Sequence, residues 1–368
     1  YILSICFALI KNFVDKIKIN FNYKNIIILF LFFILSLDLA YEIVFGWDVQ
    51  WFWYLKALNF YQDEDFLNLN KLPLSGYPHL GPYIWGFFWK FPFNNYEYLG
   101  RISYVFFYIL GIFSFSETLK INNQLTSIFS LFIILATYKY KLFDGDSDVL
   151  IFIFLLFAAK FVNYLYQPEK KENQFPIIFL LLGIGNILPW TKQEGIIFFT
   201  FLIFSMIIFN QLISKKNKLI LISSCFLLIF LRFLILHMLG VPSIDTEVQL
   251  QADVLFFDFN EFYYRITNIL FYIFVYLIQS PIYLITLPLI VISINFLKND
   301  PLNKTLLLFT FIVLGFLLFA YFFTTTEVIF NSRNSMTEVL NGFSGVYLLV
   351  IPNLLNKYLS NNKNRYLK

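Results

Sequence analysis

Long uninterrupted runs of apolar residues, separated by short polar connections, dominate the chain. A helix needs about 20 residues to cross a bilayer, and runs of that order fall at 25–46, 99–119, 122–141, 148–166, 174–190, 194–213, 217–239, 270–297, 304–323 and 336–356. Residues 1–10 could end a further span, whereas the run at 80–93 is too short to cross. Because the runs are continuous rather than alternating, they indicate helices and not a barrel. The pattern predicts an all-α, polytopic transmembrane bundle of about 10–11 spans.

Composition supports a bilayer as the solvent of this chain. Of its 368 residues, 59% are hydrophobic and 14% are charged, whereas about 25% are charged in a typical soluble domain; the mean hydropathy is +0.70. We therefore expect one transmembrane domain over 1–368, surrounded by membrane lipids, with no nucleic-acid partner. Cys6 and Cys225 both lie in apolar stretches and predict neither a disulfide framework nor a metal site. Since the first residue is Tyr1, we expect more chain ahead of it.

Basic residues predict the orientation of the bundle. If the spans alternate, the short connections on one side hold 16 of the 27 Lys and Arg residues. The positive-inside rule makes that side, together with the C-terminal tail, cytoplasmic. This charge rule, and a chain without a targeting sequence, favour a multi-pass protein of the bacterial inner membrane.

The two long loops, 47–98 and 240–269, fall on the opposite side, as do most acidic residues. The first loop contains an aromatic stretch at 51–60 and the short apolar run at 80–93. We predict that both form interfacial helices, with Trp and Tyr at headgroup depth. Because loops carry function more often than spans do, we expect this protein to work on its periplasmic or extracellular face.

Asp48 is the first candidate for chemistry. It stands in Gly46-Trp47-Asp48, where the first predicted span leaves the membrane. A carboxylate at that depth is partly desolvated, which raises its pKa and makes it a better proton acceptor. An ordinary interfacial Asp that caps a helix is the competing interpretation.

Two further segments of the first loop are candidates. Tyr77-Pro78-His79-Leu80 contains one of only two histidines, and Arg101 opens the next span. The competing interpretation is a turn followed by a snorkelling arginine.

An acidic cluster and two cations complete the candidates. Asp144-Gly145-Asp146-Ser147-Asp148 places three carboxylates in five residues, which suits a hard cation, although a solvated capping turn explains it equally well. Lys192, in a hairpin between two apolar runs, must pair with Glu194 or meet another anion such as a phosphate. Arg333, in the last predicted outer loop, is the residue type best suited to a phosphate.

Taken together, these motifs resemble the GT-C superfamily of membrane glycosyltransferases. The likeness is to bacterial members related to lipid A aminoarabinose transferases and protein O-mannosyltransferases, in which a catalytic Asp follows the first span, as Asp48 does here. Tyr77-Pro78-His79-Leu80 through Arg101, Asp146 or Asp148, Leu188 through Gly195, and Thr326 through Arg333 are similar to further elements of that family, in the same order. His79 departs from many members because no Pro-Pro follows it.

The resemblance implies an inverting transfer of a hexose or pentose from a polyprenyl-phosphate donor to a glycan, lipid or protein acceptor during cell-envelope biogenesis. Asp48 would be the base. The residues that would hold the donor phosphate are Lys192, Arg333, Arg101 and Lys56. Those expected to bind substrate are His79, Tyr77, Glu194 and Trp51. Asp146 and Asp148 are candidate ligands for a divalent metal ion, and the cofactor is otherwise open.

Three alternatives remain at this point. A transporter or flippase of a lipid-linked sugar would place charges at mid-membrane, where Asp38, Lys160 and Arg232 are the candidates. An O-antigen polymerase or ligase usually carries one dominant late outer loop, whereas here the first loop is longest. A structural membrane subunit without catalysis is the third.

Overall fold

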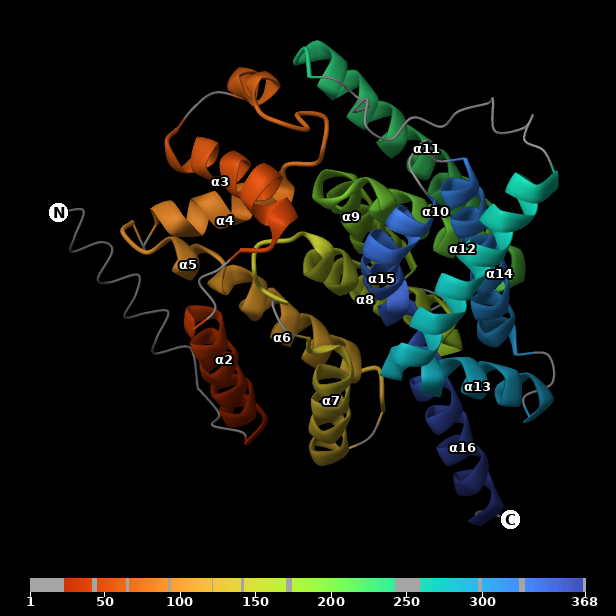
Figure 1. The fold of residues 1–368 in the computed structure, drawn as a ribbon. Helices are drawn as coiled ribbons and strands as arrows, with labels where there is room; N and C mark the ends of the chain where they lie inside the picture. Colours follow the sequence, from red (N-terminus) through yellow and green to blue (C-terminus); the bar gives the residue numbers. More distant parts are fainter. Residues whose placement is uncertain are drawn as a thin grey trace.

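The computed structural model describes residues 23–41, 45–63, 66–91, 94–120, 122–139, 142–169, 174–241, 259–296, 300–323 and 328–366. Across these ranges the chain forms helices and no strand (Figure 1). The helices are α2 (Tyr23–Tyr41), η1 (Val49–Trp53), α3 (Tyr54–Tyr61), η2 (Phe66–Lys71), α4 (Leu80–Lys90), α5 (Glu97–Gly100), α6 (Ile102–Ser116), α7 (Asn123–Thr137), α8 (Asp148–Leu165), α9 (Gln174–Thr191), α10 (Gln193–Phe209), α11 (Lys215–Met238), α12 (Phe259–Gln279), α13 (Pro281–Phe296), α14 (Pro301–Phe322), α15 (Val328–Tyr347) and α16 (Val350–Tyr366).

The prediction of a multi-pass helical membrane protein is confirmed, but the number of spans differs. Within the described ranges, seven helical segments are long and apolar enough to cross a bilayer, or eight if α12 and α13, bent by 96°, form one broken span. The α7 and α10 helices are apolar but shorter, with 15 and 17 residues. A polar residue marks one end of each of these two helices. Asn122 caps the start of α7, and Asn210, at the end of α10, donates to the Leu165 carbonyl.

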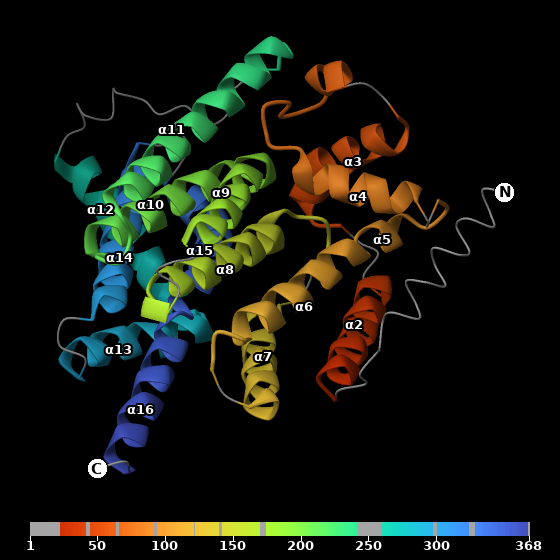
Figure 2. The ribbon, with the colours of Figure 1, turned by 180° about the vertical axis from the view of Figure 1, so that it is seen from behind.

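The α8 helix runs through the centre of the bundle, where it packs against α6, α9 and α15 (Figure 2). In the most apolar 18-residue stretch of α8, 72% is buried inside the protein. The corresponding values for α2 and α11, at the periphery, are 17% and 22%. Glycines allow the closest of these contacts. A Cβ on Gly342 or Gly345 of α15 would lie 3.3 Å from Ile151 or 3.2 Å from Phe152 of α8, so the two backbones approach as small residues permit in membranes.

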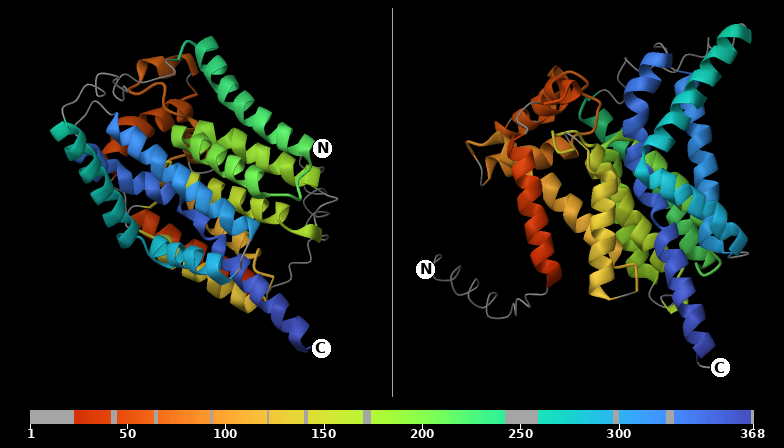
Figure 3. Two further views of the ribbon diagram at one scale, coloured as in Figure 1. Left: turned by 90° about the vertical axis from the view of Figure 1, so that its right-hand side faces the viewer. Right: turned by 60° about the horizontal axis from the view of Figure 1, so that its bottom comes forward.

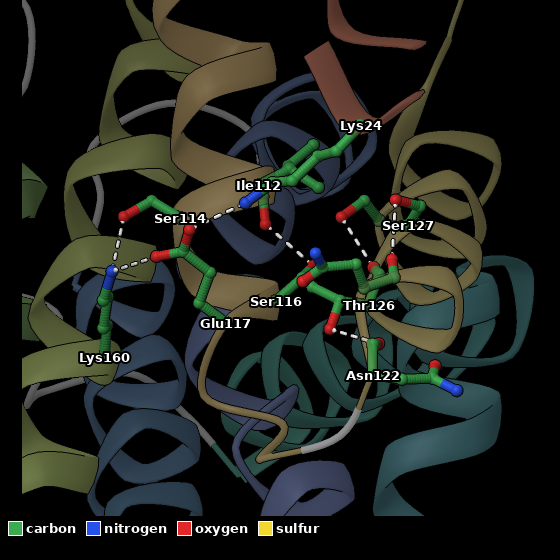
Figure 4. Close-up of polar contacts among 11 residues, drawn as sticks. Lys24, Ile112, Ser114, Ser116, Glu117, Asn122, Thr126, Ser127 and Lys160 are labelled. Atoms are coloured by element: carbon green, nitrogen blue, oxygen red, sulfur yellow. Dashed lines mark hydrogen bonds and ion pairs between the residues drawn. The ribbon is translucent and has the colours of Figure 1, made fainter. Parts of the chain in front are cut away.

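Ion pairs tie the helices together at one end of the bundle. Glu117, after α6, accepts from Lys24 of α2 at 2.7 Å and pairs with Lys160 of α8 at 3.4 Å. Lys160 also donates to Ser114 at 2.7 Å (Figure 4). Lys120, after α6, pairs with Glu169, after α8, at 3.0 Å. We call this the basic end; it holds the start of α2 and the ends of α6 and α8.

The first long loop folds into its own small helical unit beside the opposite end of the bundle (Figure 1). Its α3 and α4 helices pack on each other, and the Tyr61 ring stacks on Trp89 at 4.1 Å. The two helices expected in this loop are thus present. Of the second predicted long loop, 240–269, residues 242–258 lie outside the described residues, and so do residues 324–327.

The far end of the bundle from Lys24 and Glu117 is called the acidic end here. It carries the exit of α2, the start of α8 and the hairpin between α9 and α10 (Figure 3). There Tyr138 donates a hydrogen bond to Asp38, and Lys192 pairs with Asp148. All candidate catalytic and metal-binding residues of the sequence therefore gather at one end.

Candidate functional site

Three acidic residues meet at the acidic end. Two of them lie in helices α8 and α15, and the third lies in the turn before α8. One carboxylate oxygen each of Asp146, Asp148 and Glu338 lie within 4.8 Å of one another. We call these three residues the carboxylate cluster. Asp148 is the first residue of α8 and Glu338 lies in α15, so the glycine-mediated packing of these two helices brings the two side chains together.

Glycines also shape the turn that carries Asp146. Gly145 has a φ of +113°, a conformation that side chains disfavour, and it lies against the ring of Trp85 from α4. A Cβ on Gly46 would lie 2.9 Å from the Asp144 carboxylate. The turn that carries Asp146 therefore packs between Trp85 of the first loop and Gly46. Gly46 lies two residues before Asp48.

Lys192 lies inside the carboxylate cluster. Its Nζ is 2.5 Å from Asp148 Oδ1 and 3.9 Å from Glu338 Oε2. Burial alone would lower the pKa of Lys192, but Asp148, Asp146 and two further carboxylates raise it well above its usual value. Lys192 is therefore a permanent cation that offsets part of the charge of this cluster. The pairing with Glu194 considered from the sequence is replaced by the pairing with Asp148.

Asp48 stands at the edge of the same charged group. Its side chain reaches the surface, yet the surrounding protein removes part of its hydration, and this raises its pKa. Lys192 lowers the pKa of Asp48 and Asp148 raises it, in that order of strength. Asp48 is thus an accessible carboxylate with strengthened basicity, in electrostatic contact with the cluster.

The cluster has the donors that a divalent cation requires. Among the described residues, Asp146 Oδ1, Ser147 Oγ and Asp148 Oδ2 are buried without a hydrogen-bond partner. Burial and then repulsion by Asp148 raise the pKa of Asp146 well above its usual value. Carboxylate and hydroxyl oxygens are ligands of Mg²⁺, Mn²⁺ and Ca²⁺, so the residues fit such an ion.

A cavity of about 290 Å³ opens beside the cluster. It lies between α7, α8, α15 and the break between α12 and α13, and its lining is largely apolar. Asp148 and Lys139 line it on one side, and Ser280 and Pro281, at the break, on another. The cavity therefore places an apolar wall directly beside Asp148 of the carboxylate cluster.

The other cations expected at a phosphate do not gather with Lys192. Lys56 is fully buried and donates to the carbonyls of Leu74 (2.7 Å) and Tyr77 (3.1 Å), which fixes the loop after α3. Arg101 is fully buried and bonded to Glu97 (3.1 Å). Both therefore position the first loop.

Arg333 is exposed on α15, and its carbonyl accepts from Tyr276 at 2.6 Å. In the part of the chain that the structure describes, no ion pair joins Arg333 to the carboxylate cluster.

The residues expected to bind substrate fall at different places. Trp51 is exposed beside Trp47, Tyr77 packs on Trp53, and Glu194 follows Lys192 in the hairpin. His79 is buried on the side of α4 that faces α9 and α11. Burial, Lys56 and Arg232 lower the pKa of His79 to about 3.

Glu338 was not among the site residues predicted from sequence. It lies near the start of an apolar run, and a carboxylate within a predicted span is itself a signal of function. That signal could have identified Glu338, but not its partners, because the neighbours of a helix are decided by packing.

Comparisons with known proteins give no relative. No protein-family model matches the chain, and neither a curated protein nor a solved structure is significantly similar to it.

Proposed function

We propose that this chain is a membrane glycosyltransferase of GT-C type, which moves a sugar from a polyprenyl phosphate to an acceptor on the outer face of a bacterial inner membrane. The observation that carries the proposal is the meeting of Asp48, Lys192 and the carboxylate cluster at one end of the bundle, beside a cavity walled by α7, α8, α15 and the break between α12 and α13. A lipid-linked donor needs an apolar wall beside a charged end, and this cavity has both.

In this proposal Asp48 is the general base. Its carboxylate accepts the proton of the acceptor hydroxyl as the acceptor oxygen bonds to the anomeric carbon. The bond from that carbon to the phosphate oxygen breaks, and its electron pair leaves with the polyprenyl phosphate, so that the configuration inverts. The raised pKa of Asp48 favours the proton transfer at neutral pH.

The surroundings of Lys192 change the expectation for the donor phosphate. Asp148 already neutralises this lysine, and the acidic residues around it outnumber the cations, so a bare phosphate is repelled. The residues that would hold a divalent cation are Asp146, Asp148 and Glu338. When bound, such an ion supplies positive charge for the phosphate oxygens, while Lys192 limits repulsion within the cluster.

The test is acceptor-dependent release of polyprenyl phosphate by the purified chain from a panel of polyprenyl-phosphate hexoses and pentoses, with glycan, lipid and peptide acceptors supplied. We expect Asp48→Asn to abolish release while membrane insertion is unchanged. Asp63→Asn is the matched control, since Asp63 lies in the same loop, is exposed and pairs with Lys90. Wild-type release by Asp48→Asn, or no release by the wild-type chain from any member of the panel, contradicts the proposal.

One observation favours a second candidate, a translocase of lipid-linked sugars. The break between α12 and α13 lines the cavity beside the carboxylate cluster, and transporters often use broken helices at their substrate sites. Against it, two of the intramembrane charges have partners: Asp38 accepts from Tyr138, and Lys160 pairs with Glu117. Transbilayer movement of a fluorescent polyprenyl-phosphate sugar that survives Asp48→Asn would favour this candidate.

A further inference from the structure

A second cavity, of about 230 Å³, lies outside the carboxylate cluster, between η2, the start of α4, and the ends of α9 and α11. Eight residues form its walls, among them His79, Trp190, Leu236 and Leu239. Seven of these eight residues are apolar or aromatic, so the cavity suits a hydrocarbon segment. Its size is just below the about 300–1,000 Å³ of sites that enclose a whole drug-sized ligand.

His79 is the one strongly polar group in this wall, and it is left without a partner. The residue is only 6% exposed, and among the described residues neither Nδ1 nor Nε2 has a hydrogen-bond partner. A buried polar group without a hydrogen-bond partner destabilises the folded state. A ligand that accepts a hydrogen bond from this imidazole would remove that destabilisation.

The surroundings of His79 are basic. Arg232 lies one turn before Leu236 on α11, on the same side of the helix, and is buried. It donates to the Gly76 carbonyl at 3.4 Å, but within the described chain its Nε has no partner. Lys56 is a second buried cation near His79. Glu194 is the acidic residue that interacts with Arg232, and it does not line the cavity.

We propose that this cavity binds an amphiphile with a single anionic head group, a phosphate monoester on a hydrocarbon chain. The chain would lie against Leu236, Leu239 and Trp190, and the anion would accept hydrogen bonds from His79 and Arg232. This site differs from the carboxylate cluster in charge, because the cluster repels anions. The two sites are neighbours, since the hairpin that carries Trp190 and Lys192 borders both. The inference does not depend on sugar transfer, because it concerns occupancy of the cavity alone.

Quenching of tryptophan fluorescence by a brominated alkyl phosphate tests the site in the purified full chain in detergent. We expect saturable quenching that largely disappears in Trp190→Phe, which identifies the quenched ring among the six tryptophans. A brominated alcohol with the same chain should bind about tenfold more weakly, because charge-assisted hydrogen bonds are lost. Inorganic phosphate should compete poorly, since it lacks the apolar part.

Variants separate recognition of the head group from disturbed folding. His79→Gln and Arg232→Gln should each reduce the affinity for the alkyl phosphate to that for the alcohol. Leu239→Phe should weaken both probes by filling the cavity, and it leaves both polar groups intact. The matched control is His237→Gln, since His237 is exposed on the same helix.

Four outcomes would overturn the inference, and the first three concern the two probes and the variants. They are quenching that persists in Trp190→Phe, equal affinity for the phosphate and the alcohol, and affinity unchanged by both polar substitutions. Displacement by inorganic phosphate as strong as by the alkyl phosphate would show a free-anion site instead and would also refute it.

Discussion

Replacing His79 with glutamine should reduce the acid sensitivity of this protein. The folded chain lowers the pKa of His79 to about 3 through burial and the nearby cations Lys56 and Arg232, whereas an unfolded histidine titrates near 6.5. A depressed pKa means that the folded state excludes a proton which the unfolded state binds. The stability contributed by neutral His79 is therefore present above about pH 6.5 and is lost as the pH falls toward 3.

The size of the effect follows from the same two values. Each pH unit between them changes the free energy of unfolding by about 1.4 kcal/mol. Acidification from pH 7.5 to pH 5 should thus lower the free energy of unfolding of the wild-type chain by about 2 kcal/mol through His79 alone. The loss through His79 should reach about 5 kcal/mol near pH 3. Carboxylates such as Asp48 and Asp146, whose pKa values are raised, act in the opposite direction, so the difference between variant and wild type is the informative quantity.

The assay is unfolding by sodium dodecyl sulfate in mixed micelles, followed by tryptophan fluorescence at pH 7.5 and pH 5. We expect His79→Gln to lose about 2 kcal/mol less than the wild-type chain over this interval. His237→Gln serves as the control and should behave as wild type, because His237 is exposed. Equal losses for wild type and His79→Gln would refute the reasoning, since the pH dependence would then arise elsewhere.

Three further predictions use the same assay at pH 7.5. Lys192→Met should cost about 3–5 kcal/mol because it leaves buried carboxylates uncompensated, and adding Asp148→Asn should recover much of the loss; an unchanged midpoint would contradict the ion pair. Gly145→Ala should cost about 1–3 kcal/mol, because alanine disfavours a φ of +113° and its Cβ would meet the Trp85 ring; wild-type stability would contradict the strained turn. Asp300→Ala should cost at least about 1–2 kcal/mol, because Asp300 caps α14, accepts from Asn353 and pairs with Lys357, and no loss would argue against these contacts.

The sequence by itself determined the class of this protein and the residues that deserved testing. Apolar runs must become helices in lipid, because hydrocarbon offers no partner for an open backbone; the chain therefore had to be a helical membrane protein. Asp48, Asp146, Asp148 and Lys192 were candidates because charged residues are costly near a bilayer. Such local arguments say which residues need a partner, and not which partner they have.

Only the tertiary structure decided the partners. Glu338 joins Asp148 because Gly342 and Gly345 let α15 approach α8, a contact between residues 190 positions apart that no local pattern encodes. Packing likewise buried Lys56 and Arg101 in the first loop and left Arg333 exposed, although all three have the residue type of a phosphate ligand. Hydropathy follows residue type along one helix, whereas the site depends on shape complementarity between several helices.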